Sequence, residues 1–94
     1  MKQYKLSKEA ENDLIRIHQR GVTEHGEVQA DKYYFAFFKR FELITEQPYL
    51  YQAVNHIREG YRHSVCGADT IYYRLTGDTV EIMSILRGQD KKPL

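Results

Sequence analysis

The sequence predicts an α+β fold of order β-α-α-β-β-β, with a helical hairpin packed on one face of a four-stranded antiparallel sheet. Apolar residues recur at helical spacing through residues 8–46 and alternate with polar ones through residues 61–87. Short glycine-containing turns at 67–69 and 76–78 divide the alternating part, and such turns join antiparallel neighbours. A chain of 94 residues has room for one compact core, so residues 1–94 are expected to form a single domain.

The first two elements are a short strand and a helix. Residues 2–6, KQYKL, alternate as a strand does, and Ser7 follows at a position typical of a helix N-cap. The next residues carry an apolar stripe at spacings of four and three: Ala10, Leu14 and Ile17. Gly26 is free to adopt the left-handed conformation that ends a helix, so the first helix is expected to stop there.

The second helix is predicted over residues 27–46, where aromatic residues give the strongest helical periodicity, and Pro48 closes it. Three strands follow at 61–67, 69–76 and 79–87. The helical hairpin is expected to return the chain so that the second strand lies antiparallel beside the first. Both helices then cover one face of the sheet and leave the other open, and function is sought on that open face.

Composition excludes several classes of function. The net charge is only +1, from 14 basic and 13 acidic residues, whereas tight nucleic-acid binders usually carry a clear basic excess. Cys66 is the single cysteine, and the four histidines show no metal-ligand spacing. No apolar run is long enough to span a bilayer. A reduced, cytoplasmic protein is expected, without membrane contact, metal or cofactor, and the tail from about residue 89 is expected to be flexible.

Four stretches of the sequence are distinctive in combination: LSKEAENDLIRI at 6–17, HGEVQADKYYFAFFKRFELI at 25–44, IREGYR at 57–62 and IYYRLTGDTVEIMSILRGQD at 71–90. Together, from Tyr4 to Asp90, they resemble the ParE branch of the RelE/ParE superfamily of bacterial toxins. The resemblance implies a toxin that is neutralised by a small ParD-like antitoxin. It also implies that the toxin acts on DNA gyrase by protein binding, trapping cleaved DNA, and that it is not an enzyme. A homodimer or a hetero-oligomer with the antitoxin is compatible with this assignment.

Two alternatives stay open. RelE-like relatives are ribosome-dependent endoribonucleases, which need cations at the scissile phosphate and an acid for the leaving oxygen. This sequence has Thr70 and Ser64 where that pattern places cations, and its tail GQDKKPL offers neither Tyr nor His. His63 and Arg87 could still form an acid–cation pair. The second alternative is a non-toxic module that binds an antitoxin.

The alternation within the strands predicts which side chains are exposed. Arg62, Ser64 and Cys66 share one face of their strand, and this set is expected to point away from the helices because a buried unpaired arginine is costly. Tyr61 and His63 are then expected to face the helices.

In the next strand Thr70, Tyr72 and Arg74 are expected on the open face, with Ile71, Tyr73 and Leu75 towards the helices. Both faces of the last strand are largely apolar, so some apolar side chains are expected to point outwards and to meet a partner. The predicted surface for binding the antitoxin or gyrase comprises seven residues: Arg58, Arg62, Tyr72, Arg74, Met83, Ile85 and Arg87.

Overall fold

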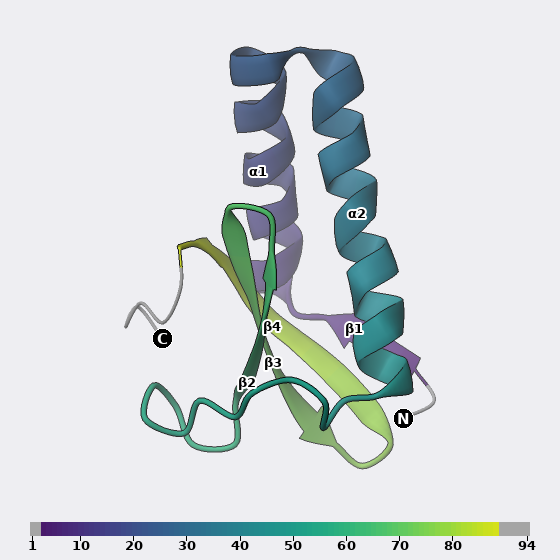
Figure 1. The fold of residues 1–94 in the computed structure, drawn as a ribbon, viewed down its shortest axis with the longest axis vertical. Coiled ribbons are helices and arrows are strands. Elements are labelled where there is room, and N and C mark those ends of the chain that lie inside the picture. The colour runs from purple at the N-terminus through teal and green to yellow at the C-terminus, as the bar shows by residue number, and fades with distance from the viewer. Residues whose placement is uncertain (1–2, 89–94) are drawn as a thin grey trace.

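A computed structural model describes residues 3–88. Its elements are β1 (Gln3–Leu6), α1 (Lys8–His25), α2 (Glu27–Glu46), β2 (Arg62–Cys66), β3 (Asp69–Thr76) and β4 (Thr79–Arg87). The predicted order β-α-α-β-β-β is confirmed, and the two helices stand side by side as a hairpin above a twisted sheet (Figure 1). The tail from about residue 89, which is predicted to be flexible, lies outside the described residues.

The sheet is mixed, which corrects the purely antiparallel arrangement expected. The strands lie in the order β1-β4-β3-β2, and β1 pairs with β4 in parallel while the other two pairs are antiparallel. The expectation that β2 lies beside β1 is therefore wrong, because these strands form opposite edges of the sheet. Residues 47–61 connect α2 to β2 and are long enough to carry the chain to the far edge before the meander begins.

Local capping fixes the ends of α1. The Ser7 side chain accepts a hydrogen bond from the Ala10 N–H at 3.0 Å, as predicted for an N-cap, and donates to the Met83 carbonyl at 2.8 Å. The same residue therefore starts the helix and ties it to β4. Gly26, at φ 86°, separates α1 from α2 and donates its N–H to the Val22 carbonyl at 3.0 Å. The sharp reversal between the helices thus depends on a glycine.

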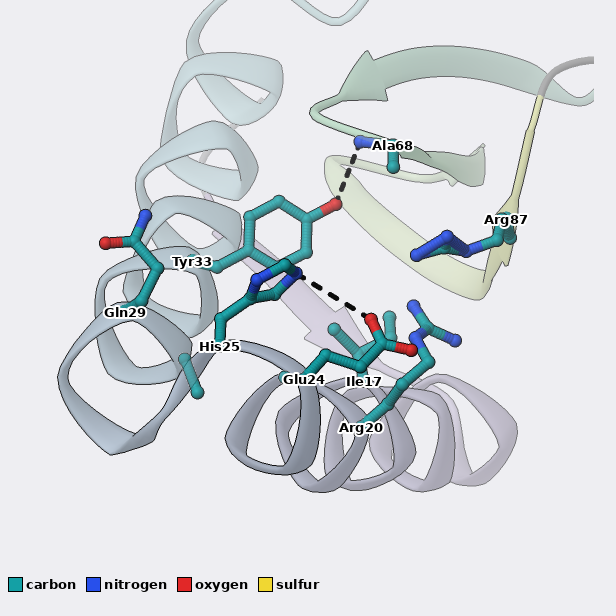
Figure 2. A pocket seen from close by; sticks show the side chains of 10 residues that line it. Ile17, Arg20, Glu24, His25, Gln29, Tyr33, Ala68 and Arg87 are labelled. Carbon is teal, nitrogen blue, oxygen red and sulfur yellow. Dashed lines mark hydrogen bonds and ion pairs between the residues drawn. The ribbon is translucent and has the colours of Figure 1, made fainter.

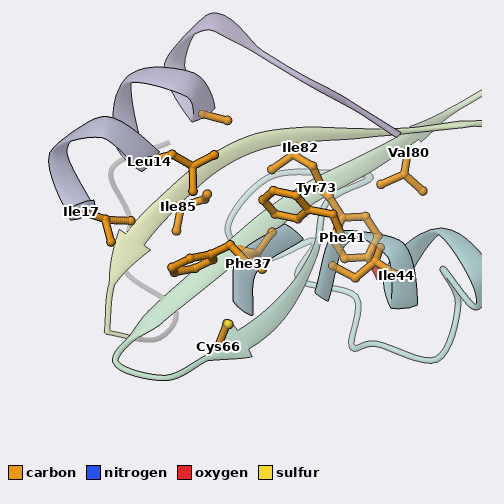
Figure 3. Packing of buried hydrophobic residues seen from close by; sticks show 12 residues of the cluster. Leu14, Ile17, Phe37, Phe41, Ile44, Cys66, Tyr73, Val80, Ile82 and Ile85 are labelled. Carbon is orange, nitrogen blue, oxygen red and sulfur yellow. The ribbon is translucent and has the colours of Figure 1, made fainter. Parts of the chain in front are cut away.

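The main core lies between the hairpin and one face of the sheet (Figure 3). The buried residues shown there come from both helices and from three strands: Leu14, Ile17, Phe37, Phe41, Ile44, Cys66, Tyr73, Val80, Ile82 and Ile85. Full burial of a large apolar side chain stabilises a fold by about 1.5–3 kcal/mol. The helices approach closely near Gly21, where an added Cβ would lie 3.2 Å from the Cβ of Ala30.

A β-bulge in β4 explains why both faces of this strand are apolar. Tyr72 of β3 pairs with Ser84, but the next residue, Tyr73, pairs with Ile82, so Met83 is an extra residue in β4. The insertion changes which side chains face the helices beyond it. Ile82 before the bulge and Ile85 after it both belong to the main core, and Met83 packs on the other face.

The second face of the sheet, which was expected to be open, is largely covered by the segment that connects α2 to β2. Val54 and Tyr61 from the connecting segment bury themselves against Tyr72, with Ile57, Met83 and Leu86 around them. The Val54 N–H bonds to the Tyr61 carbonyl at 2.8 Å, and the His63 N–H bonds to the Gln52 carbonyl at 3.1 Å. With both helices on one side, residues 47–61 cover Tyr72 and much of the apolar surface on the other side, where Val65 stays 37% exposed. We call the group packed around Tyr72 the second core.

Candidate interaction sites

Two of the predicted partner-binding residues are buried inside the protein. Tyr72 and Ile85 are both 0% exposed, Tyr72 in the second core and Ile85 in the main core. Met83 is half-buried in the second core. The prediction that Tyr72 and Ile85 are exposed is wrong. Residues 47–61 cover Tyr72, and the bulge turns Ile85 towards the helices.

Arg62 also lies elsewhere than predicted. It shares its strand face with Ser64, which accepts a hydrogen bond from Arg40 of α2 at 2.8 Å, and with Cys66 of the main core. The predicted faces of β2 are therefore exchanged, and Tyr61 and His63 point to the second core side. Arg62 lies at the edge of the sheet and is only partly buried, so its charge is not left without partners. It donates to the Tyr51 carbonyl at 2.7 Å, and its guanidinium lies 5.1 Å from the centre of the Tyr49 ring.

Arg58 and Arg74 are exposed, as predicted, but belong to separate regions. Arg58 lies in the connecting segment, with its guanidinium 5.7 Å from the centre of the Tyr61 ring. Arg74 pairs across the strands with Glu81, donating to its carboxylate at 2.9 Å. Hydrogen bonds from Thr76 and Arg74 lower the pKa of Glu81. Arg58, Arg74 and Arg62 therefore do not form one cationic surface. The role of Arg58 and Arg74 in binding a partner stays a prediction.

Arg87 is exposed at the end of β4 but faces the helices. It lines a pocket of about 240 Å³ between the hairpin and the turn that joins β2 to β3. Figure 2 shows the Arg87 side chain extending from β4 towards the guanidinium of Arg20, which comes from α1. The other lining residues are mainly from the two helices: Ile17, Gly21, Glu24, His25, Gln29, Ala30, Tyr33 and Ala68. Arg87 is therefore surface-exposed as predicted, on the opposite face of the sheet.

A hydrogen-bond network forms one wall of this pocket. The Tyr33 hydroxyl donates to the Asp69 carboxylate at 2.7 Å and accepts from the Ala68 N–H at 3.1 Å. Arg20 forms an ion pair with the same carboxylate at 3.5 Å, and Asp69 is 1% exposed. Burial, followed by the bond to Asp69, raises the pKa of Tyr33, so its hydroxyl stays protonated and keeps donating.

Neither Arg20 nor Tyr33 is among the site residues predicted from the sequence. The signal that could have revealed them is Asp69, an acidic residue at the start of the strongly apolar strand β3. A carboxylate at the start of a buried strand needs a cation and hydrogen-bond donors around it. The network supplies them, with Arg20 as cation and Tyr33 as donor. The pocket is suited to binding an anionic group.

The described part of the chain offers little for other chemistry. Within residues 3–88 no group of three or more His, Cys, Asp or Glu side chains is placed to hold a metal ion. Burial raises the pKa of the Cys66 thiol, which makes it a poor nucleophile. Among these residues, no helix combines the length and the apolar character needed to cross a membrane.

A second candidate surface is an exposed apolar groove between the helices. One depression of about 390 Å³ is lined by residues of both helices: Ile15, His18, Gln19, Asp31, Tyr34 and Phe35. A neighbouring depression of about 310 Å³ also includes Ile15 and Tyr34, so the two are continuous. Ile15 is 54% exposed and Phe35 is 62% exposed. Contiguous exposed apolar surface of this kind is typical of sites that contact another protein.

Comparison with known proteins agrees with the resemblance seen in the sequence. The family model of the ParE toxin of type II toxin–antitoxin systems, parDE, matches residues 4–91. Toxin ParE1 of Caulobacter vibrioides is 35% identical over 86 residues, covering 92% of this chain and 88% of the relative. Toxin ParE1 of Mycobacterium tuberculosis is 30% identical over 84 residues, covering 88% and 86%.

The fold is also found in a solved structure, a chromosomal ParDE toxin–antitoxin system from P. aeruginosa. Its matching chain superposes with a TM-score of 0.82 at 18% identity, over 95% of this chain and 97% of that one. At this identity the match establishes the shared fold, and the family model and the two relatives establish the family. The chain belongs to the ParE toxins of type II toxin–antitoxin systems.

Proposed function

We propose that this ParE-family chain inhibits DNA gyrase by protein binding and is neutralised by a cognate ParD-like antitoxin. The observation that carries the proposal is the family match over residues 4–91. The matching P. aeruginosa structure is of a ParDE toxin–antitoxin system, which supports an antitoxin partner for this chain. The exposed groove with Ile15 and Phe35 supplies apolar surface of the kind a protein partner covers. The proposed place of action is the cytoplasm, where the chromosome is.

The placement of the candidate catalytic residues supports a non-enzymatic action. His63 pairs with Tyr72 on the second core side, whereas Arg87 lines the pocket on the helix side. An acid and a cation on opposite faces of a sheet cannot act on one phosphate group. Thr70, at the position where the ribonuclease pattern has a cation, is 0% exposed and bonds to the Gly88 carbonyl. These placements favour gyrase inhibition over the RelE-like alternative.

Induced expression in a bacterial host tests the proposal. Growth should stop on induction, because replication fails when gyrase is blocked, and should recover when a ParD-like protein encoded beside this chain is co-expressed. Messenger RNA mapped by primer extension should show no new cuts at ribosomal A sites. Growth that continues while the complex forms would indicate the non-toxic module instead. A-site cuts that vanish in a His63→Ala variant would indicate the ribonuclease.

A further inference from the structure

We propose that the pocket between the hairpin and the β2–β3 turn binds a peptide carboxylate, from an acidic residue that stands next to an apolar one. This site goes beyond the proposed function, because neither the family assignment nor gyrase inhibition specifies it. Two arginines from different elements, Arg20 of α1 and Arg87 of β4, point into one cavity above an apolar floor (Figure 2).

The two arginines have hydrogen-bond donors to spare for a bound anion. Arg87 pairs with Asp69 through the β-ladder, but its side chain, which extends over the pocket, makes no hydrogen bond or ion pair within residues 3–88. Arg20 reaches Asp69 only at 3.5 Å, and that carboxylate already accepts a shorter bond from Tyr33 at 2.7 Å. A carboxylate matches the planar fork of a guanidinium and bonds to it in pairs. A carboxylate in the pocket can therefore use donors of both side chains.

The floor of the pocket is apolar and the cavity is small. Ile17, Gly21 and Ala30 line it with apolar groups, and Gly21 adds no side chain to the space, since an added Cβ there would lie 3.2 Å from the Cβ of Ala30. A volume of about 240 Å³ lies below the range of roughly 300–1,000 Å³ typical of pockets for cofactors and drug-sized ligands. The pocket thus suits one or two side chains of a peptide, with methylene groups on the floor and the charged end at the arginines.

An acidic residue in the lining favours a carboxylate over a phosphate or a nucleic acid. Glu24 belongs to the lining, and its carboxylate lies 3.7 Å from the Nε2 atom of His25, which also lines the pocket. An anion in the pocket therefore also meets the negative charge of Glu24. A dianion or polyanion is repelled more strongly by that charge than a monoanion. The net charge of +1 gives the surrounding surface little capacity to offset this repulsion. The occupant with the best fit is a single carboxylate.

A pair of matched peptides tests the site on the full chain. Acetyl-Leu-Glu-Phe-amide and its uncharged twin acetyl-Leu-Gln-Phe-amide are titrated into ¹⁵N-labelled protein at fixed ionic strength. The Glu peptide should bind about tenfold more tightly or better, because hydrogen bonds between charged groups are worth more than neutral ones. The amide shifts should centre on Arg20, Gly21 and Ala68. No binding, or equal affinity for the two peptides, would overturn the proposal.

Two variants and one further ligand test whether the Arg87 guanidinium causes the preference for the Glu peptide. Arg87→Gln should remove most of the preference for the Glu peptide, whereas Lys39→Gln, a change at an exposed cation outside the pocket, should leave it unchanged. The amide spectra of both variants also report whether the fold is retained. An unchanged preference in folded Arg87→Gln would overturn the proposal. Inorganic phosphate should bind more weakly than the Glu peptide, and tighter binding of phosphate at the same amides would contradict a carboxylate site.

Discussion

Replacing Tyr72 by alanine is expected to lower the free energy of unfolding by about 3–5 kcal/mol, the cost of truncating a buried aromatic side chain. Tyr72 is 0% exposed and packs with Val54 and Tyr61 in the second core. The change should leave a cavity beneath residues 47–61 and detach them from the sheet. Because small domains are stable by only about 5–15 kcal/mol, urea unfolding followed by circular dichroism will measure a large shift.

Tyr49→Ala is the matched control for this experiment. Tyr49 is a tyrosine of the same connecting segment but is 67% exposed, with the Arg62 guanidinium over its ring. Its truncation should cost below about 1 kcal/mol, the value of an exposed cation–π contact. If Tyr72→Ala were no more destabilising than Tyr49→Ala, residues 47–61 would not cover the sheet, and Tyr72 would again be a candidate for contact with a partner.

The Gly67→Ala variant is expected to lose about 2–4 kcal/mol of stability from backbone strain and overpacking together. Gly67 has φ 62°, which disfavours any residue with a side chain, and an added Cβ would overlap the ring of Tyr33 and lie 2.8 Å from its hydroxyl oxygen. The Tyr33 ring cannot move aside easily, because its hydroxyl is bonded to Asp69 and Ala68. Thermal or urea unfolding measures the loss.

Gly77→Ala separates the two causes. Gly77 has nearly the same φ, 61°, but nothing lies within 4 Å of an added Cβ. This variant should show the strain alone, about 1 kcal/mol. The difference between the two variants then measures the contact with Tyr33. Equal losses at both positions would show that the Tyr33 network yields without cost, and would weaken the case for a rigid pocket wall.

Local patterns predicted the elements well. Periodicity and capping placed α1 from Ser7 to Gly26 and α2 over residues 27–46, and alternation placed β2, β3 and β4 within one residue of their bounds. The expectation that Ile71, Tyr73 and Leu75 face the helices is also confirmed. These features depend on neighbours in the sequence, where hydrophobic spacing carries the information.

Features that depend on distant residues were not predicted. Whether β1 joins β4 or β2 is decided by the path of residues 47–61, which have no periodic pattern. The same segment supplies the Tyr51 carbonyl that makes the position of Arg62 acceptable on the helix side. The bulge at Met83 exchanges the faces of β4, so simple alternation misplaced Ile85 and Arg87. A one-residue shift in register reverses every side chain that follows it.

The sequence predicted the chemical character of the candidate site but not most of its residues. A surface combining arginine with apolar groups was expected, and the pocket has that character, but only Arg87 of the seven predicted residues lines it. Arg20 and Tyr33 reach it from two helices, and the turn at Ala68 closes it. A site built by residues so far apart in the sequence has no local motif to reveal it.

A supercoiling assay with purified DNA gyrase tests the proposed function most directly. The protein, free of antitoxin, is incubated with gyrase, ATP and relaxed plasmid, and the products are treated with detergent and protease before electrophoresis. We predict that supercoiling falls as the protein is added and that cleaved plasmid accumulates, because the toxin traps gyrase on broken DNA. Full supercoiling in the presence of excess folded protein, with no cleaved plasmid, would contradict gyrase as the target.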